Sequence, residues 1–413
     1  MSKLLLAFYL FLIILLSVRL FLFFSLTPKI TEGENIAVST TLLSEPSFIN
    51  NNQQFSVRVG NAFSSKKVQV YAASSPLYHY SDSLFITGKI AKKTLKNNQV
   101  ILVMYFPKIK NDISKNFVLA INYFIRQKIT SSFGDILSPT SSSLLLGIVF
   151  GIKDNFPKSF MNNLQVSGVL HVIAASGMNV SLIGTFMLTF FTRFTKRQIA
   201  ISLSIFAILF YSLLSGWQPS ILRACFMMLA VLASQLFGRQ YSSIYILIVV
   251  GVLMIIFTPE LIFDVGFQLS FLATLGIIVI KPMFPAVPLL SDDLGTTIAA
   301  QIATLPILVA VFGKYSLISI LVNGIVLWTI APLMILGILA AIASFIFIPF
   351  TVLALSICKP ILWFFESIVN FFGSSNLYLD LKGVTWPFIA GYYLILLSMT
   401  LLLRDRKTAS EEI

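Results

Sequence analysis

Polar residues inside apolar segments are the candidates for chemistry in this sequence. The segment 168–182 contains Gly168, His171, Ser176, Gly177 and Asn179. On a helix, Gly168 and Asn179 fall close to one line, with His171 to one side and Ser176 to the other. This face is small and polar, and a Ser-Gly pair favours a helix break. Two interpretations stay open: a seam where helices pack closely, or the lining of a polar path.

His171 and Ser176 are also a Ser/His pair of the kind that nucleophilic enzymes use. Five residues apart on a helix, the two side chains point about 140° apart, which does not suit a nucleophile and its base. The apolar segments hold no pair of carboxylates, and the chain has neither a Walker A loop nor GxGxxG. With two His and two Cys, it also lacks a His-rich or Cys-based metal site. We therefore predict no enzyme, no metal and no cofactor, with a membrane-embedded enzyme as the weakest alternative.

Further polar residues stand alone in later apolar segments. Arg223 lies near the end of its segment, where it either faces the interior or water, or snorkels to the interface. Gln268 and Asn323, taken singly, would each form an interhelical hydrogen bond. Together these residues predict a shared path lined by His171, Ser176, Asn179, Arg223, Gln268 and Asn323. Helix breaks or close packing are expected at Gly168, Gly177 and Gly266.

The composition shows which elements must position these residues. Of 413 residues, 57% are hydrophobic and 11% are charged, against about 25% charged in soluble proteins. This predicts an α-helical polytopic membrane protein. Ten spans of suitable length are expected, at 4–26, 169–191, 198–214, 219–237, 242–257, 263–280, 293–313, 316–331, 332–349 and 385–403. Lys and Arg in the short loops and the tail place both termini in the cytoplasm, in a cytoplasmic (inner) membrane.

Residues 28–115 differ from the rest, because they are polar and carry 11 Lys/Arg against 5 Asp/Glu. Five short β-branched or aromatic stretches, separated by turn-prone clusters, predict a small extracytoplasmic β-domain, with an OB-fold as the leading guess. Aromatic and basic residues on such a barrel suit single-stranded nucleic acid. The alternative is an ordinary barrel core with a solvated basic rim. The candidate DNA contacts are Lys66, Lys67, Tyr71, Tyr78, Tyr80 and Lys89.

The expected organisation has six parts. They are a transmembrane anchor at 1–27, the β-domain at 28–111, amphipathic and re-entrant helices at 112–152, a multi-span domain at 153–349, an interfacial helix and outer loop at 350–384, and a last span and cytoplasmic tail at 385–413. A cleaved signal peptide is the alternative for the first part. The apolar run 143–152 is too short to span, so it is either re-entrant or buried among other helices.

Several motifs in one order resemble the ComEC family of competence proteins. They are SSSLLLGIVFGIKDNFPKSFMNNLQVSGVLHVIAASGMNVSLI, GWQPSILRACFMM, TPELIFDVGFQLSFLATLGI and TLPILVAVFGKYSLISILVN, and they cover roughly residues 135–335. The resemblance implies a channel that moves single-stranded DNA into the cytoplasm during natural transformation. The sequence departs from the family at Asn179, where many members have His. It also lacks the HxHxDH motif of a metallo-β-lactamase-like domain. We therefore expect the channel part alone.

The resemblance also implies partners. These are single-stranded DNA, membrane lipids, a cytoplasmic ATP-driven DNA translocase, an extracytoplasmic DNA receptor and a separate nuclease, with a homo-oligomer left open. The alternative function is a secondary transporter or flippase for a small or lipid-linked anion, which would work by alternating access.

Overall fold

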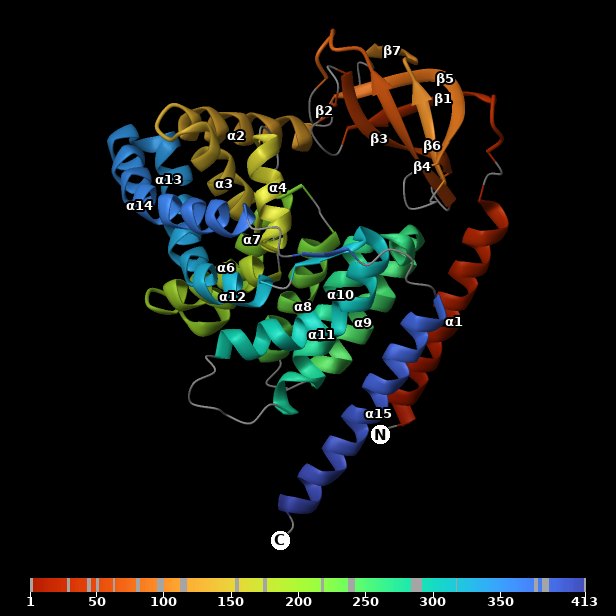
Figure 1. Cartoon of the computed structure of the whole chain (residues 1–413), viewed down its shortest axis with the longest axis vertical. Coiled ribbons are helices and arrows are strands. Elements are labelled where there is room, and N and C mark those ends of the chain that lie inside the picture. The colour runs from red at the N-terminus through yellow and green to blue at the C-terminus, as the bar shows by residue number, and fades with distance from the viewer. Residues whose placement is uncertain are drawn as a thin grey trace. The chain divides into compact units, whose positions relative to one another are not determined.

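The structure is a computed structural model, and two compact units make up the chain. It describes residues 3–27, 30–42, 46–49, 52–61, 64–78, 82–94, 100–111, 117–152, 156–173, 177–216, 219–236, 242–283, 292–316, 318–374, 378–380 and 386–411. Unit 1 contains Met1–Ile129 and Val252–Ile262, and unit 2 contains Thr130–Gly251 and Phe263–Ile413. The elements of both are labelled in Figure 1.

Unit 1 begins with the apolar helix α1 and continues as a small curled sheet (Figure 1). The elements are α1 (Lys3–Leu26), β1 (Asn35–Thr41), β2 (Ser47–Ile49), β3 (Asn52–Asn61), β4 (Ser64–Ala72), β5 (Ser83–Thr94), β6 (Val100–Tyr105) and β7 (Lys108–Asn111). The strand order is β1-β5-β6-β4-β3-β2, and β7 pairs with β5. The β4–β6 pair is parallel, whereas the other pairs among the described strands are antiparallel.

Alternation of apolar and polar residues explains why these segments form strands with one buried face. On β4, Val68 and Val70 are fully buried, while Gln69 between them is half-buried and Lys67 before them is exposed. The same pattern on β5 buries Leu84, Ile86 and Ile90. The five predicted strands are all present, and β2 and β7 are short additional strands that pair with the edges of β3 and β5. The prediction of a small β-domain after the first apolar helix is confirmed.

Unit 2 is helical. Its elements, with α2 and α9 shared between the units, are α2 (Phe117–Gly134), α3 (Pro139–Phe150), α4 (Lys158–Val166), α5 (Leu170–Ile173), α6 (Gly177–Thr192), α7 (Arg197–Leu214), α8 (Pro219–Leu236), α9 (Ser243–Phe257), α10 (Val265–Val279), α11 (Asp292–Phe312), α12 (Ser319–Val326), α13 (Ile330–Ile346), α14 (Ile348–Gly373) and α15 (Trp386–Glu411). The short strands β8 (Lys314–Ser316) and β9 (Tyr378–Asp380) pair, and three 3-10 turns complete the unit: η1 (Pro259–Phe263), which begins in unit 1, η2 (Lys281–Met283) and η3 (Leu327–Thr329).

Among the described residues, seven helical segments are long and apolar enough to cross a membrane. They are Tyr9–Leu26, Arg197–Leu214, Pro219–Leu236, Val265–Met283, Leu294–Val311, Ser319–Ile346 and Ile348–Gly373. The number is lower than the ten spans predicted but compatible with them, because three predicted spans fall on the shorter apolar helices α6, α9 and α15, and the predicted spans 316–331 and 332–349 lie together in Ser319–Ile346. The segment α14 was predicted to lie at an interface, and it is one of the seven.

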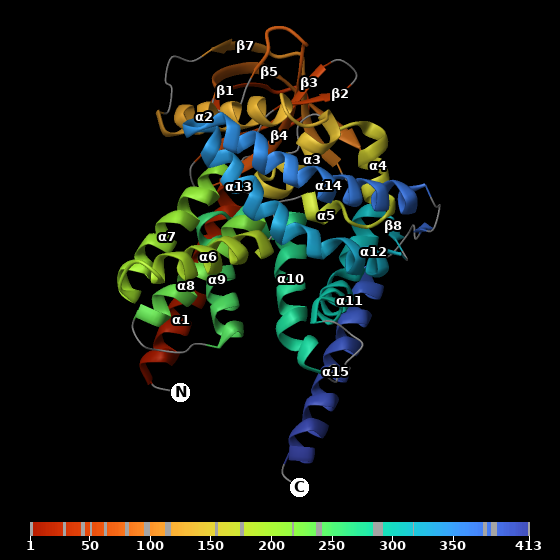
Figure 2. The same cartoon turned by 90° about the vertical axis from the view of Figure 1, so that its left-hand side faces the viewer.

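Helix α3 contacts α13, α14 and α5 (Figure 2). Every residue from Ser142 to Phe150 is buried. Of the two interpretations of this short apolar run, burial among other helices is the one observed. Helix α14 covers it with a buried seam at 3-4 spacing, Leu355, Cys358, Leu362, Phe365 and Val369, which is the spacing of a helix face packed against other helices.

Candidate functional site

Arg223 lies on α8 between α6 and α10, and it is 6% exposed. Its Nη1 donates a hydrogen bond to the Thr274 hydroxyl on α10, and its guanidinium carbon lies 5.9 Å from the centre of the Phe271 ring. Its Nε has no acceptor among the described residues. Its Nη2 faces Gly177, where an added Cβ would come within 2.6 Å. The structure therefore brings two of the predicted residues, Gly177 and Arg223, into contact.

Asn179 lies two residues after Gly177 on α6, and its side chain binds the end of α3. Its Nδ2 donates to the Ile148 carbonyl at 2.7 Å, and the Tyr211 hydroxyl donates to the Val149 carbonyl at 2.8 Å. Gly151, in the left-handed region with φ of 68°, donates to Gly147. The last carbonyls of a helix have no partner within it, so these donors complete α3 inside the protein. Asn179 is 1% exposed, and its amide has a clear structural use.

Gly168 separates α4 from α5 and packs against the beginning of α12. Its φ is +76°, and an added Cβ would collide with Ser319 and lie 3.2 Å from the Ser316 Cβ. Ser319 also accepts a hydrogen bond from Gln301 Nε2 on α11 at 3.0 Å. His171, on the exposed side of α5, has Nδ1 3.2 Å from the Gly168 carbonyl. A second group of small and polar residues thus lies between α4, α11 and α12.

The remaining predicted path residues are spread over the helical unit. Asn323 on α12 is 1% exposed, and its Oδ1 accepts no hydrogen bond from the described residues. Gln268 on α10 is half-buried, and Gly266 is exposed in the first turn of the same helix. Ser176 lies outside the described residues. The predicted residues therefore fall into the Arg223 group, the Gly168 group and these separate positions.

In the β-domain, Tyr71 belongs to an aromatic and basic cluster. Tyr71 on β4 stacks on Tyr105 of β6, with ring centres 5.3 Å apart and planes at 19°. Lys93 on β5 donates a hydrogen bond to the Tyr71 hydroxyl at 3.1 Å, and its Nζ lies 4.8 Å from the centre of that ring. This hydrogen bond raises the pKa of Lys93, so the amine stays charged at neutral pH. We call Tyr71, Tyr105 and Lys93 the tyrosine–lysine cluster.

The other predicted DNA contacts of the β-domain differ in exposure. Lys67 and Lys89 are exposed, and Lys66 is half-buried. Tyr78 is 7% exposed, packs edge-on against Phe55 and belongs to the barrel core, where burial raises its pKa. A buried ring cannot stack on a base, so Tyr78 is removed from the candidate surface. Tyr80 lies outside the described residues.

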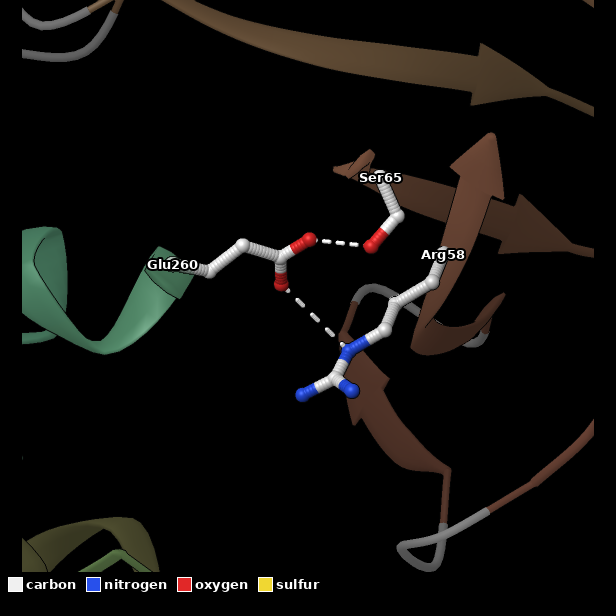
Figure 3. A network of polar contacts seen from close by, with 3 residues as sticks. All are labelled: Arg58, Ser65 and Glu260. Atoms are coloured by element: carbon white, nitrogen blue, oxygen red, sulfur yellow. Dashed lines mark hydrogen bonds and ion pairs between the residues drawn. The ribbon is translucent and has the colours of Figure 1, made fainter. Parts of the chain in front are cut away.

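A polar contact joins the β-domain to the turn after α9 within unit 1. Glu260 accepts a hydrogen bond from Ser65 of β4, and its other oxygen lies 3.5 Å from Nε of Arg58 on β3 (Figure 3). Also within unit 1, Nε of Arg19 on α1 donates to the Ile256 carbonyl near the end of α9 at 3.0 Å. Arg19 thus has an acceptor at the end of another helix.

Several residues of these groups were missed by the sequence interpretation, among them Phe271, Thr274, Ser319, Tyr211, Tyr105 and Lys93. Tyr105 and Lys93 could have been suspected, since each stands at an outward position of a predicted strand or beside one. Thr274 and Tyr211 carry no local signal. No group of three or more His, Cys, Asp or Glu that could hold a metal ion occurs among the described residues, and the site offers hydrogen bonding, stacking and one buried positive charge.

Comparison with known proteins gives the family. Residues 148–406 match the family described as "Competence protein". The chain is 29% identical to ComE operon protein 3 of Bacillus subtilis over 48% of the chain and 26% of that protein. It is 29% identical to an uncharacterized protein of Aquifex aeolicus over 50% of the chain and 49% of that protein. It is 25% identical to the uncharacterized protein YcaI of Escherichia coli, over 50% of the chain and 30% of that protein.

The matched part of the chain thus spans half or less of the length of each of these curated relatives. No solved structure matches the chain. The family match covers more than half of the chain, and it includes six of the seven helical segments that could cross a membrane. This multi-pass membrane protein belongs to the competence protein family.

Proposed function

We propose that this protein takes part in DNA uptake, as a membrane channel that passes single-stranded DNA into the cytoplasm during natural transformation. The observation that carries the proposal is the match of residues 148–406 to the competence protein family. The chain itself performs no bond cleavage in this proposal. It provides a route, and the strand is moved by another protein.

The tyrosine–lysine cluster supports a DNA-binding role for the β-domain. Base stacking on aromatic side chains is sequence-tolerant, and a nearby cation neutralises the backbone. Tyr105 is 50% exposed and already stacked on Tyr71, with charged Lys93 beside it. In an OB-fold, oligonucleotides bind on the face of the second and third strands. Counting β1 and β2 together as the first strand makes β3 and β4 the second and third. Lys67 and Tyr71 lie on that face.

Sparse charge in the helical unit supports passage rather than capture. A path with many cations would trap a polyanion, because conduction requires binding that is weak and spread over several sites. Arg223 is the only charged side chain among the fully buried residues that the structure describes. His171, Asn179, Gln268 and Asn323 offer hydrogen bonds without fixed charge, and Ser176 is proposed with them.

The contact of Glu260 with the β-domain supports the proposed orientation. Glu260 lies in the turn after α9, and it contacts Ser65 and Arg58 within the described part of the β-domain. Two segments in contact lie on one side of the membrane. This agrees with a proposed topology in which that turn and the β-domain are extracytoplasmic, while both termini are in the cytoplasm of a protein in the cytoplasmic membrane.

The proposal implies partners. An ATP-driven translocase in the cytoplasm would pull the strand, a receptor outside would deliver DNA, and a separate nuclease would degrade the complementary strand. To test the function, the gene is deleted and entry of fluorescent DNA into the cytoplasm is measured. We expect entry to stop while DNA still binds outside the cell, and to return when the full chain is restored. Normal entry in the deletion strain would reject the proposed function.

A further inference from the structure

Arg223 is a buried positive charge without a negative partner. Its contacts are the Thr274 hydroxyl and the Phe271 ring, and neither carries a negative charge. Among the residues that the structure describes, no carboxylate lies within 4.0 Å of the guanidinium. A buried charge is costly unless it is paired and hydrogen-bonded. The charge of Arg223 is therefore unpaired within the described part of the chain, which favours an anion as its ligand.

The guanidinium is held so that one edge stays open. Thr274 donates its own hydrogen to the Ser270 carbonyl at 3.0 Å, which turns its oxygen toward Nη1 as an acceptor. Nε and Nη2 have no acceptor among the described residues. These two nitrogens form the side edge of the guanidinium, whose parallel N–H groups bind an oxyanion with two hydrogen bonds. Thr274 thus orients the guanidinium and leaves its Nε–Nη2 edge without an acceptor.

The open edge points to the beginning of α6. Nη2 faces Gly177, the first residue of this 16-residue helix, and it takes up the space that a side chain at Gly177 would need. A helix beginning carries partial positive charge and free N–H groups, so a cation placed there is repelled and an anion is attracted. A guanidinium at this place is stabilised when an anion binds beside both, at its free edge. The edge of Arg223 and the first turn of α6 thus favour the same ligand.

We propose that Arg223 and the first turn of α6 form a binding site for a phosphodiester group, oriented by Thr274. The inference rests on the proposed function for one source of that group, the backbone of the passing strand, while a phospholipid head group is the other source. A planar fork with a single charge matches a singly charged phosphodiester. One such site binds weakly, so that each phosphate of the strand can be held and released in turn.

The first test measures binding of a fluorescent single-stranded oligonucleotide to the purified full chain in a phosphate-free maltoside detergent. We expect Arg223→Gln to make the dependence of log K on log salt shallower by about 0.7, the value for one phosphate contact to a single strand. Arg193→Gln removes an equal charge from an exposed position of the same unit and is the matched control. With an uncharged methylphosphonate oligonucleotide, wild type and Arg223→Gln should bind equally.

The second test separates the two sources and does not depend on DNA. Inorganic phosphate and phosphatidylglycerol, added separately, should raise the Tm of the wild type and not of Arg223→Gln. Without ligand, Arg223→Gln should melt at or above the Tm of the wild type, because it removes an unpaired charge. If the lipid effect depends on Arg223 and the DNA slope does not, the head group is the source. If neither DNA, phosphate nor lipid distinguishes the variant, the proposal is rejected.

A third variant, Gly177→Ala, covers the case in which Arg223→Gln does not fold. Gly177→Ala keeps the charge, and its Cβ would push only the flexible Nη2 end of Arg223. We expect it to fold normally and to lose the phosphate-induced rise in Tm; an unchanged rise contradicts the site. Failure of the proposed function can be told apart from failure of this site. If deletion of the gene leaves DNA uptake intact, the proposed function fails, but phosphate can still raise the Tm of the purified protein through Arg223.

Discussion

The β-domain and the helical unit treat positive charge in opposite ways. In the β-domain, Lys67 and Lys89 project into solvent from the strands, and Lys93 binds half-buried Tyr71, which stacks on exposed Tyr105. In the described part of the helical unit, the buried charge is confined to Arg223, which is held by neutral groups. Solvated cations attract a polyanion over a distance that salt controls. A buried cation such as Arg223 acts only on an anion that is already in contact with it.

The two regions also use polar side chains differently. In the helical unit, Asn179 and Tyr211 bind backbone carbonyls at the end of α3, so their first use is to complete a buried helix. In the β-domain, polar and aromatic side chains of the outward face bind one another and remain accessible. A polar residue in an apolar segment can thus serve the fold, even where it stands in a candidate path.

The largest expected effect concerns Gly168 in the helical unit. Gly168→Val places a β-branched residue at φ of +76°, with its Cβ against Ser319. Strain of about 1–3 kcal/mol and overpacking of about 1–3 kcal/mol should together lower the free energy of unfolding by about 2–6 kcal/mol. The measurement is unfolding of the detergent-solubilised full chain. Gly391→Ala, where no atom lies within 4 Å, is the control. A stable Gly168→Val protein would contradict the close packing.

The second prediction tests the tyrosine–lysine cluster. Tyr105→Ala removes a stacking partner, and each stacked base contributes about 1–3 kcal/mol, so affinity for single-stranded DNA should fall roughly 5- to 150-fold. The control is Phe85→Ala, which removes another exposed aromatic side chain from the same domain. Fluorescence anisotropy with the full chain measures both. Equal losses in the two variants would mean that the stacked pair has no special role.

The third prediction tests whether Asn179 stabilises the fold or lines the DNA path. Asn179→Leu leaves the Ile148 carbonyl without its donor and should lower the free energy of unfolding by about 1–2 kcal/mol. Asn179→His, the residue that many ComEC relatives have, restores a donor and should recover most of the stability. Tyr211→Phe should cost a similar amount. If Asn179→Leu is as stable as wild type and yet blocks DNA entry, the residue acts in the path alone.

The smallest effect is expected at Glu260. Arg58 is 57% exposed in its side chain and Glu260 is 22% exposed, so their ion pair is screened. A double-mutant cycle with Glu260→Gln and Arg58→Gln should give a coupling of about 0–1 kcal/mol that falls with salt. A coupling well above this range would show that the contact is shielded from water, which would contradict its place at the edge of the β-domain.

The elements of the fold could be predicted where one segment contains its own signal. The alternation of Val68 and Val70 with polar residues specifies a strand, and the length of the apolar run near Leu144 and Leu145 excludes a span. The buried face of α14, from Leu355 to Val369, could also have been predicted from its 3-4 spacing of apolar residues. The interfacial assignment gave more weight to Trp363, which is exposed on the opposite side.

The site could be predicted only in part, because its contacts join distant segments. Tyr71 and Tyr105 meet through a parallel pairing of β4 and β6 that no local pattern encodes. Arg223 and Thr274 are 51 residues apart and meet through the packing of α8 on α10. Tyr78 shows the opposite error, since an aromatic residue near a turn looked accessible and proved to be core.

Helix α3 has a consequence for how the chain is made. It is too short to span and buried all round, yet its covering helices are synthesised much later: Gly337 of α13 packs on Val149, and Glu366 of α14 accepts a hydrogen bond from Ser141. At roughly 5–20 residues per second, the ribosome needs about 10–40 s to reach α13. During that time α3 lacks its final neighbours. A chaperone or the insertion machinery must shelter it until the last helices emerge.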